Sequence, residues 1–486
     1  MSISPARVLL LFALATSLVL SAAAPATPAA GEPLAKISPS VLEDTAAGGT
    51  TSFLVLLASS ADVTGAQTLP TKLAKGHYVF QTLRAFADRT QAPIKALLAR
   101  MGAPYRSHFL VNLLWVRGGR AVVDALAARA DVARILSDPW IRSSILPDRP
   151  AGSTAPSSAP ATIEWNIKRV RAPRAWADGF TGQGIVLGNI DTGQQWDHPA
   201  LKSHYRGWNG TTADHNYNWY DATDPSNRAP LDPYGHGTHT AGIMVGDDGG
   251  TNQIGVAPGA QWMSCRSMDS GGFGSPDTYI TCFEFMVAPW DLNGQNPDPS
   301  KAPVAVSNSW FCSISTESCS QDVLLRTVHN VRAAGIVPVV AAGNSGPGCR
   351  TIGIDGPPAQ YDDSYTVGAT TQSNVLASFS SRGPVSFLGR RVKPDISAPG
   401  VAVRSSVPPN AYAVLSGTSM ATPHIAGVIA LIYSAKPQLI GDVAGTEALI
   451  NATAQHINSS ECTSNGSYPN NLYGYGLVDA AAAVKP

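Results

Sequence analysis

Apolar and polar positions follow two different rhythms along the chain. In the first part, residues 51–58, 107–116 and 132–138 are short apolar runs typical of strands, and residues 77–101 and 120–130 have the apolar spacing of helices. This order predicts a small α+β unit whose helices pack on one face of an antiparallel sheet.

In the later part, longer apolar runs alternate with helical segments. The runs GIVLGNID (184–191), VAVSNSW (304–310) and IVPVVAAGN (336–344) end in turns rich in Gly, Asn or Ser. Helical spacing occupies residues 276–290 and 322–335 between them. The alternation predicts an α/β fold of three layers, a doubly wound and mostly parallel sheet with helices on both faces. Ligands of such sheets bind at the carboxyl ends of the strands.

A segment rich in Pro, Ser and Ala, residues 143–162, separates the two parts and is typical of an exposed linker. We expect a processing site in it. At the N-terminus an apolar run, residues 8–20, is too short to span a bilayer and is followed by small residues, which predicts a signal peptide over residues 1–26. The expected parts are thus this signal peptide, a unit with its lead segment (27–142), the linker, and a main domain (163–486). We expect a secreted, extracellular protein without a membrane anchor.

Composition narrows the class of protein. Of the 486 residues 44% are hydrophobic and 14% charged, and the formal net charge is zero. These values are typical of a globular protein and give no indication of nucleic acid or an anionic membrane as partner. The six cysteines, all after residue 260, predict three disulfides in an exported protein, and the short Cys312–Cys319 loop is the favoured pair among 15 possible pairings. The spacing of HGTH (236–239) does not suit zinc, and we expect no catalytic metal.

Four polar residues lie at strand ends or helix starts. Asp191 follows an apolar strand, His236 lies between two glycines before a helical run, Asn344 ends a strand, and Ser419 begins an apolar helix. Each has an ordinary structural interpretation: a turn aspartate, a structural histidine, a turn asparagine and a helix cap. Together they supply an acid, a base, an amide donor and a hydroxyl, which are the parts of acyl transfer through a Ser-His-Asp triad with an oxyanion hole.

The segments that carry these residues resemble a known family. DTG, GHGTHTAG, AAGNSG and SGTSMATPHIAG, in this order, are similar to the signature segments of the subtilisin-like serine proteases, as are FSSRGP (379–384) and KPDISAPG (393–400). The resemblance covers nearly all of residues 161–486. Residues 51–140 resemble the ferredoxin-like inhibitory pro-domain that precedes such enzymes.

Two further segments, WNIKRVRAPRAW (165–176) and YRGWNG (205–210), look closest to the bacillopeptidase F branch of the family. The resemblance implies a monomeric secreted endopeptidase that acts on proteins or peptides. It would be made as an autoprocessed zymogen with its own pro-domain as intramolecular inhibitor.

The resemblance also implies a role for each of the four residues. Asp191 would orient His236, which would take the proton of Ser419 and deliver it to the leaving amine. Asn344 and the backbone N–H of Ser419 would hold the oxyanion.

The resemblance further implies two sets of substrate-binding residues. The walls of the first specificity pocket would be formed by Ser309, Trp310, Phe311, Ala341, Ala342 and Gly343. An edge strand that pairs with an extended substrate would contain Gly271, Gly272 and Phe273. The family usually has Gly at the position of Phe311, so the pocket is expected to be narrower or closed on one side. Ordinary packing is the alternative for both phenylalanines.

No cofactor is expected for the chemistry. A structural calcium ion stays open, because Ala200 stands where the family often has a calcium-binding aspartate. Other carboxylates that could bind calcium are Asp197, Asp247, Asp248, Asp362 and Asp363, but solvated turn carboxylates are the better interpretation.

Other classes of protein fit the sequence less well. A catalytically silent, secreted binding protein on the same fold would lack a catalytic group, and none is missing here. A lipase or esterase needs a G-x-S-x-G elbow, whereas GTSMA around Ser419 lacks the second glycine. Acid-acting relatives with a Ser-Glu-Asp site are disfavoured by His236 and Asn344.

Overall fold

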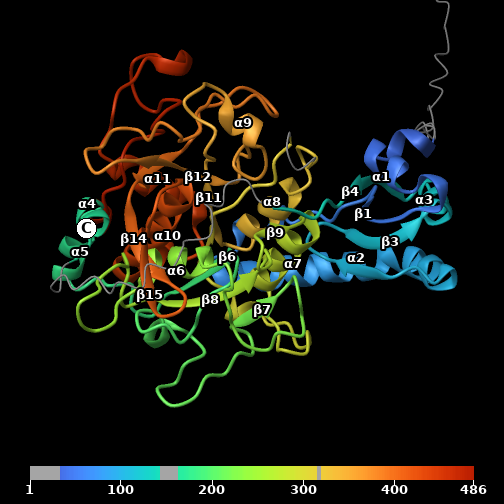
Figure 1. The fold of residues 1–486 in the computed structure, drawn as a ribbon, viewed down its shortest axis with the longest axis horizontal. Coiled ribbons are helices and arrows are strands. Elements are labelled where there is room, and N and C mark those ends of the chain that lie inside the picture. The colour runs from blue at the N-terminus through green and yellow to red at the C-terminus, as the bar shows by residue number, and fades with distance from the viewer. Residues whose placement is uncertain (1–32, 143–162, 315–318, 486) are drawn as a thin grey trace, which may run out of the picture.

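The computed structural model describes residues 33–142, 163–314 and 319–485 (Figure 1). The predicted signal peptide (1–26) and the predicted linker with its processing site (143–162) lie outside these ranges. No helix in the described ranges is long and apolar enough to cross a membrane.

The N-terminal unit, residues 33–142, is a four-stranded antiparallel sheet with the order β2-β3-β1-β4. Two helices cross over between strands in the order βαββαβ, as expected for a ferredoxin-like unit. Its elements are α1 (Pro39–Asp44), β1 (Thr50–Leu57), α2 (Lys72–Met101), β2 (Tyr105–His108), β3 (Leu113–Gly119), α3 (Arg120–Ala127) and β4 (Val132–Ser137).

One predicted strand of this unit is wrong. Residues 107–116 form the end of β2, a turn, and the start of β3 rather than one strand. The chain reverses there because Asn112 takes a positive φ of 50°. Its side chain holds the turn, since Nδ2 donates to the carbonyl of Ser59 at 2.9 Å and Oδ1 accepts from Gln91 at 3.1 Å.

The main domain is built on a seven-stranded sheet with the order β13-β12-β11-β10-β6-β8-β7, in which every neighbouring pair is parallel. The strands are β6 (Val186–Asp191), β7 (Trp219–Asp221), β8 (Gln261–Arg266), β10 (Ala305–Asn308), β11 (Val337–Ala341), β12 (Tyr365–Thr370) and β13 (Ile396–Pro399). Most of their side chains are buried on both faces, which explains the continuous apolar runs.

Helices cover both faces of this sheet (Figure 1). One face packs against α6 (His236–Val245) and α10 (Thr418–Ala435), and the other against α7 (Pro276–Val287) and α8 (Leu325–Ala333). The remaining elements are peripheral: α4 (Trp165–Arg169), α5 (Ala172–Ala177), α9 (Thr351–Asp355), β14 (Val403–Val407), β15 (Ala411–Leu415), α11 (Val443–Thr453) and α12 (Ala480–Ala483). The predicted three-layer α/β fold is confirmed.

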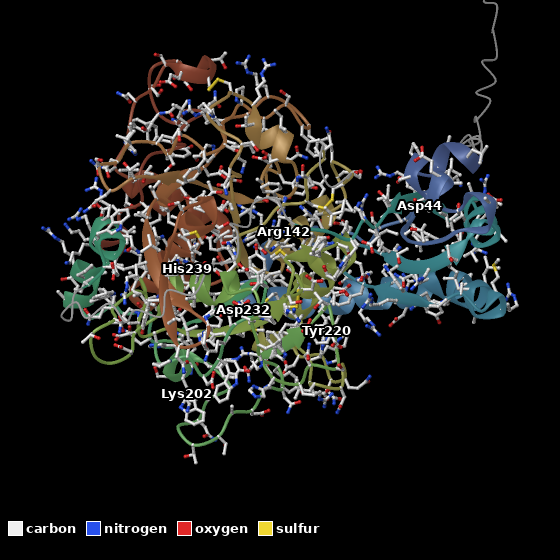
Figure 2. All side chains as sticks on the ribbon, viewed as in Figure 1. Asp44, Arg142, Lys202, Tyr220, Asp232 and His239 are labelled. Carbon is white, nitrogen blue, oxygen red and sulfur yellow. A yellow bond between two sulfur atoms is a disulfide. The ribbon has the colours of Figure 1, made fainter. Side chains whose placement is uncertain are left out.

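The N-terminal unit packs on α7 and α8, and apolar residues of both parts belong to one buried cluster. Its last strand, β5 (Ile141–Arg142), pairs antiparallel with β9 (Phe273–Gly274) of the main domain. Arg142 lies against the main domain (Figure 2), where its guanidinium donates to the hydroxyl of Tyr234 at 2.9 Å.

All six cysteines form disulfides. The predicted Cys312–Cys319 pair is present, and the other two are Cys265–Cys282 and Cys349–Cys462.

Candidate active site

The predicted catalytic residues meet at the carboxyl edge of the sheet, where the strand order reverses. The chain continues from β6 to β8 on one side and later adds β10 on the other side of β6. Asp191 is the last residue of β6, Ser309 follows β10, and Asn344 lies three residues after β11. Such a reversal is where doubly wound sheets bind their ligands.

Asp191 and His236 are joined by a short hydrogen bond in a buried setting. Nδ1 of His236 lies 2.7 Å from Oδ1 of Asp191, and neither residue is exposed to solvent. The backbone N–H of Thr192 also donates to Oδ1 at 2.7 Å, and the hydroxyl of Thr240 donates to Oδ2 at 3.2 Å. The carboxylate is therefore fixed and holds the imidazole in one orientation, with Nε2 as the ring nitrogen available for proton transfer.

Glycine allows the first turn of α6 to approach the end of β6. A Cβ atom at Gly237 would lie 2.0 Å from the carbonyl oxygen of Gly193 and 3.0 Å from Cβ of Asp191. The N-cap of the helix, Gly235, has a positive φ of 100°. Any larger residue at Gly237 would push His236 away from its carboxylate.

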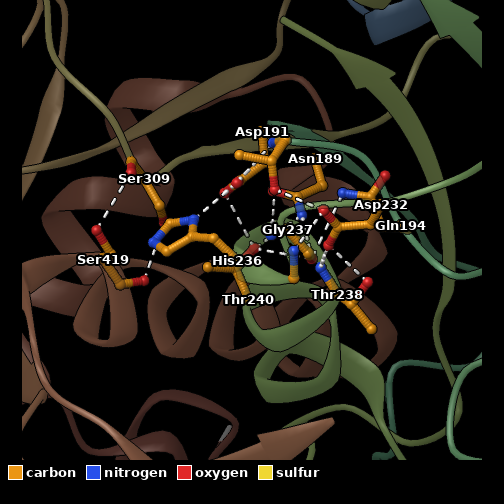
Figure 3. Close-up of polar contacts among 12 residues, drawn as sticks. Asn189, Asp191, Gln194, Asp232, His236, Gly237, Thr238, Thr240, Ser309 and Ser419 are labelled. Atoms are coloured by element: carbon orange, nitrogen blue, oxygen red, sulfur yellow. Dashed lines mark hydrogen bonds and ion pairs between the residues drawn. The ribbon is translucent and has the colours of Figure 1, made fainter. Parts of the chain in front are cut away.

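Ser419 lies beside this pair, with the imidazole of His236 between it and Asp191 (Figure 3). The interpretation of Ser419 as the helix cap is wrong by two residues, because Gly417 is the N-cap of α10 and Ser419 is the second residue of the helix. Its Oγ donates to the carbonyl of Ser309 at 3.2 Å, and Ser309 Oγ donates to the carbonyl of Ser419 at 2.9 Å. Nε2 of His236 is buried and makes no hydrogen bond to the described residues. Nucleophile–base bonds of this kind often tighten only when substrate is bound.

Asn344 directs its amide toward the start of α10. Its Oδ1 accepts from the backbone N–H of Thr418 at 2.9 Å and from the Thr418 hydroxyl at 3.0 Å. A Cβ atom at Gly417 would lie 3.4 Å from Nδ2 of Asn344 and 3.6 Å from the backbone nitrogen of Ser419. Two N–H donors thus border the same space beside Gly417, and donors placed in this way can bind an oxyanion.

Asp232 was not predicted from the sequence, and its side chain links the turn after Asp191 to the start of α6. Its buried carboxylate accepts from the Thr192 hydroxyl at 2.9 Å and from the N–H groups of Gly235 at 2.7 Å and Thr238 at 2.8 Å. Burial raises the pKa of this carboxyl above its usual value, although the bonds from Gly235 and Thr238 lower it. The signal was present, because an acid four residues before His236 precedes the helix start, where capping residues occur.

The residues predicted to line the first specificity pocket differ in their contacts and in their burial. Ser309 bonds to Ser419, while the Trp310 ring is fully buried and stacks on Tyr279 with 4.0 Å between centroids. Phe311 is 3% exposed, so for this side chain packing is the better interpretation. Ala341 and Ala342 are buried beneath the loop that begins at Gly343, whose φ is 104°.

The predicted edge strand is shorter than expected. Only Phe273 and Gly274 form a strand, whereas Gly271 and Gly272 form the preceding turn, in which Gly272 has a φ of 79°. Phe273 is 36% exposed, and its partner in the strand pairing is Arg142 of the N-terminal unit.

The remaining histidines of the signature segments have structural partners. Nε2 of His239 lies 3.1 Å from the carbonyl of Ala413, and burial lowers its pKa to about 3. His424 bonds to the carbonyl of Met420 within α10 and to Asn166 of α4, and burial lowers its pKa to about 4. Both are neutral core histidines.

Each of the five carboxylates considered above for calcium has a partner within the protein. Asp362 pairs with Arg391, and Asp363 with His329. The other three are engaged within their own loops, Asp197 with Gln195, Asp247 with Gly249 and Asp248 with Asn252. Among the described residues, no group of three or more His, Cys, Asp or Glu side chains is placed to hold a metal ion.

Comparison with known proteins places the chain in a family. The model of the subtilase family (Peptidase S8) matches residues 182–476. Bacillopeptidase F of Bacillus subtilis (strain 168) is 36% identical over 450 residues, which cover 88% of this chain and 30% of that protein. Subtilisin Savinase of Lederbergia lenta is 33% identical over 324 residues, which cover 67% of this chain and 99% of that protein.

The family match and these relatives support a serine-type endopeptidase on this α/β fold. The chain belongs to the subtilase family, as its signature segments indicated. It spans 30% of the length of bacillopeptidase F.

Proposed function

We propose that this chain is a secreted serine endopeptidase that hydrolyses peptide bonds with Ser419, His236 and Asp191. The observation that carries the proposal is the 2.7 Å bond between His236 and Asp191, beside a hydroxyl at the start of α10. The predicted signal peptide (1–26) and the three disulfides support secretion.

The reaction follows from this geometry. Oγ of Ser419 attacks the peptide carbonyl while Nε2 of His236 takes its proton, and Asp191 stabilises the imidazolium that forms. The negative charge develops on the carbonyl oxygen beside Gly417, where Nδ2 of Asn344 and the N–H of Ser419 donate to it. His236 then protonates the leaving amine, and water hydrolyses the acyl-enzyme with the same base.

The N-terminal unit acts as an intramolecular inhibitor in this proposal. Its last strand, β5, already pairs with β9 in the antiparallel manner of an extended peptide substrate. Arg142, the last described residue before the proposed cleavage segment, therefore lies next to the proposed substrate strand. We propose that the enzyme cuts itself within residues 143–162 and that the unit then remains bound as an inhibitor until it is degraded.

Self-cleavage is tested with Ser419→Ala. Expressed in a host that lacks other proteases, this variant should accumulate as one chain that retains residues 27–142, whereas the wild type should yield two fragments on a denaturing gel. The control is Ser226→Ala, which removes a surface hydroxyl that donates to Asp224 and should still be processed. Normal processing of Ser419→Ala would contradict self-cleavage.

A second experiment separates an endopeptidase from a silent binding protein. A serine-directed organophosphate should abolish casein hydrolysis and label the mature protein once, with the label on the peptide that contains Ser419. Labelling of another serine would overturn the site assignment, and absence of both hydrolysis and labelling would favour the binding protein.

A further inference from the structure

Asp355 is a buried acid for which the proposed reaction has no use. It ends α9, is 3% exposed, and forms no ion pair with any described residue. Its two carboxylate oxygens accept from the hydroxyls of Ser345 and Ser381. Burial raises the pKa of this carboxyl to about 6, so it is charged at neutral pH in a setting that disfavours the charge.

The carboxylate lies against the loop that carries Asn344, residues 343–346. A Cβ atom at Gly343 would lie 2.0 Å from Oδ2 of Asp355, and the φ of Gly343 is 104°. Only glycine therefore lets the carboxylate approach the backbone immediately before Asn344. Ser345, immediately after Asn344, donates its hydroxyl to the same carboxylate.

The FSSRGP segment (379–384) completes this arrangement. The N–H of Ser345 donates to Oγ of Ser381 at 2.9 Å, and the N–H of Ser381 donates to the carbonyl of Gly343 at 3.0 Å. The N–H of Gly346 donates to the carbonyl of Phe379 at 2.7 Å. The loop is thus held on both sides of Asn344, and Asp355 and Ser381 form the centre of the contacts that hold it.

We propose that Asp355 is a positioning residue that fixes the Asn344 amide for oxyanion binding, acting through Ser345 and Ser381. The inference rests on the proposed function, because it assigns a task to Asn344. Asn344 is held by Thr418 at its amide oxygen, and this network holds the residues on either side of it. A donor that is fixed before the reaction needs no reorganisation when the oxyanion forms, which is the source of its effect on rate.

The network predicts a kinetic effect without an effect on substrate binding. In the mature enzyme, Asp355→Asn keeps the size of the side chain but places an N–H₂ group opposite one serine hydroxyl. With a peptide anilide, kcat should fall about tenfold while KM stays within about twofold. A peptide aldehyde, which forms a tetrahedral adduct with Ser419, should bind about tenfold more weakly, and the cleaved product peptide should bind unchanged.

The serine partners supply variants that remain informative if Asp355→Asn fails to fold. Ser345→Ala removes one hydroxyl from the carboxylate and should lower kcat in the same direction. The double variant Ser345→Ala/Asp355→Asn should lose less than the product of the two single losses, because both act through one network. As a matched control, Asp442→Asn changes the N-cap of α11 and should leave kcat and KM unchanged.

The result also distinguishes positioning from direct contact with the substrate. If kcat/KM fell only for substrates with lysine or arginine before the scissile bond, Asp355 would be binding that side chain and the proposal would be wrong. Equal kcat for wild type and for both the Asp355 and Ser345 variants would likewise overturn it. Asn344→Ala tests the underlying function separately: if it retained full kcat, the oxyanion role itself would fail.

Discussion

At the residue scale, the proposed catalytic groups depend on Asp232, which touches neither the reacting serine nor the imidazole. Its carboxylate joins the turn after Asp191 to the first turn of α6, through Thr192 on one side and Gly235 and Thr238 on the other. A third, buried acid thereby links the two segments that carry the acid and the base.

Replacement of Asp232 by alanine should therefore affect both stability and rate. Asp232→Ala leaves buried donors of Thr192, Gly235 and Thr238 without an acceptor, and we expect the free energy of unfolding to fall by about 2–4 kcal/mol. Guanidinium unfolding in a Ser419→Ala background, which prevents autolysis, measures this loss. In the otherwise unmodified enzyme kcat should fall about tenfold.

The exposed turn acid Asp224 is the control for this change. It accepts from Ser226 at the surface, so Asp224→Ala should change the free energy of unfolding by less than about 0.5 kcal/mol. An equal loss of unfolding free energy in the Asp232 and Asp224 variants would show that the Asp232 carboxylate does not stabilise the site.

The role of a single residue could be predicted where the residue belongs to a sequence motif. It could not be predicted where packing against distant residues determines whether the side chain is buried. Asp191, His236, Asn344 and Ser419 lie in segments whose order and turn glycines identified them, and the structure brings them to one edge. Phe311 shows the limit, because its burial depends on partners that are remote in sequence.

At the element scale, α7 carries two carboxylates that contact the N-terminal unit. His108 at the end of β2 is fully buried, with Nε2 2.8 Å from Asp277 and Nδ1 3.2 Å from Glu284. Burial disfavours the imidazolium, but Glu284 and Asp277 outweigh this cost and raise its pKa to about 9. Nearby, burial and the charge of Asp277 raise the pKa of Asp138 to about 7.

Both shifts predict that alkaline pH releases the N-terminal unit. The imidazolium of His108 contributes its full stabilisation below its ordinary pKa of 6.5, and this is lost as pH rises through about 9. The raised pKa of Asp138 acts in the same direction, because the stabilisation by its proton is full below pH 3.8 and is lost as pH rises through about 7. For His108 alone the effect is on the order of 3 kcal/mol, or roughly 100-fold in affinity.

The prediction is measured on the processed complex after inactivation with an organophosphate. Size-exclusion chromatography at low concentration should show the two parts together at pH 6.5 and separate at pH 9.5. His108→Gln should weaken the complex at pH 6.5 and remove most of the pH dependence. A wild-type affinity that is the same at both pH values would contradict the role of His108.

Elements were predictable where the apolar rhythm was long, as for α10 and the strands of the main sheet. The rhythm failed at residues 107–116, because the apolar side chains of the turn between β2 and β3 are buried against the main domain. Phe109 and Leu110 belong to the buried cluster shared with α7 and α8. They are therefore apolar because they lie in the interface with the main domain, and not because they form a strand.

At the scale of the whole molecule, fold class followed from the alternation of strands and helices, but strand order and disulfide pairing did not. Both depend on which distant segments meet. Cys349 lies shortly after the Asn344 loop, and Cys462 lies in the C-terminal loop region, 113 residues later. No local pattern links them, whereas Cys312 and Cys319 are separated by only 7 residues.

This difference in loop length predicts different contributions to stability. A cross-link that closes a loop of about 100 residues stabilises by roughly 4–5 kcal/mol in the chain-entropy account, and one of about 7 residues by roughly 2 kcal/mol. Paired Cys→Ser variants at positions 349 and 462 should therefore lower the midpoint of unfolding more than variants at 312 and 319. Both are compared by guanidinium unfolding in the Ser419→Ala background.

Since the Cys349–Cys462 disulfide also anchors the segment after Asn344, loss of this pair should lower kcat in the active enzyme as well. A larger loss of stability for the 312/319 pair would show that strain or local packing, and not loop closure, governs these bonds.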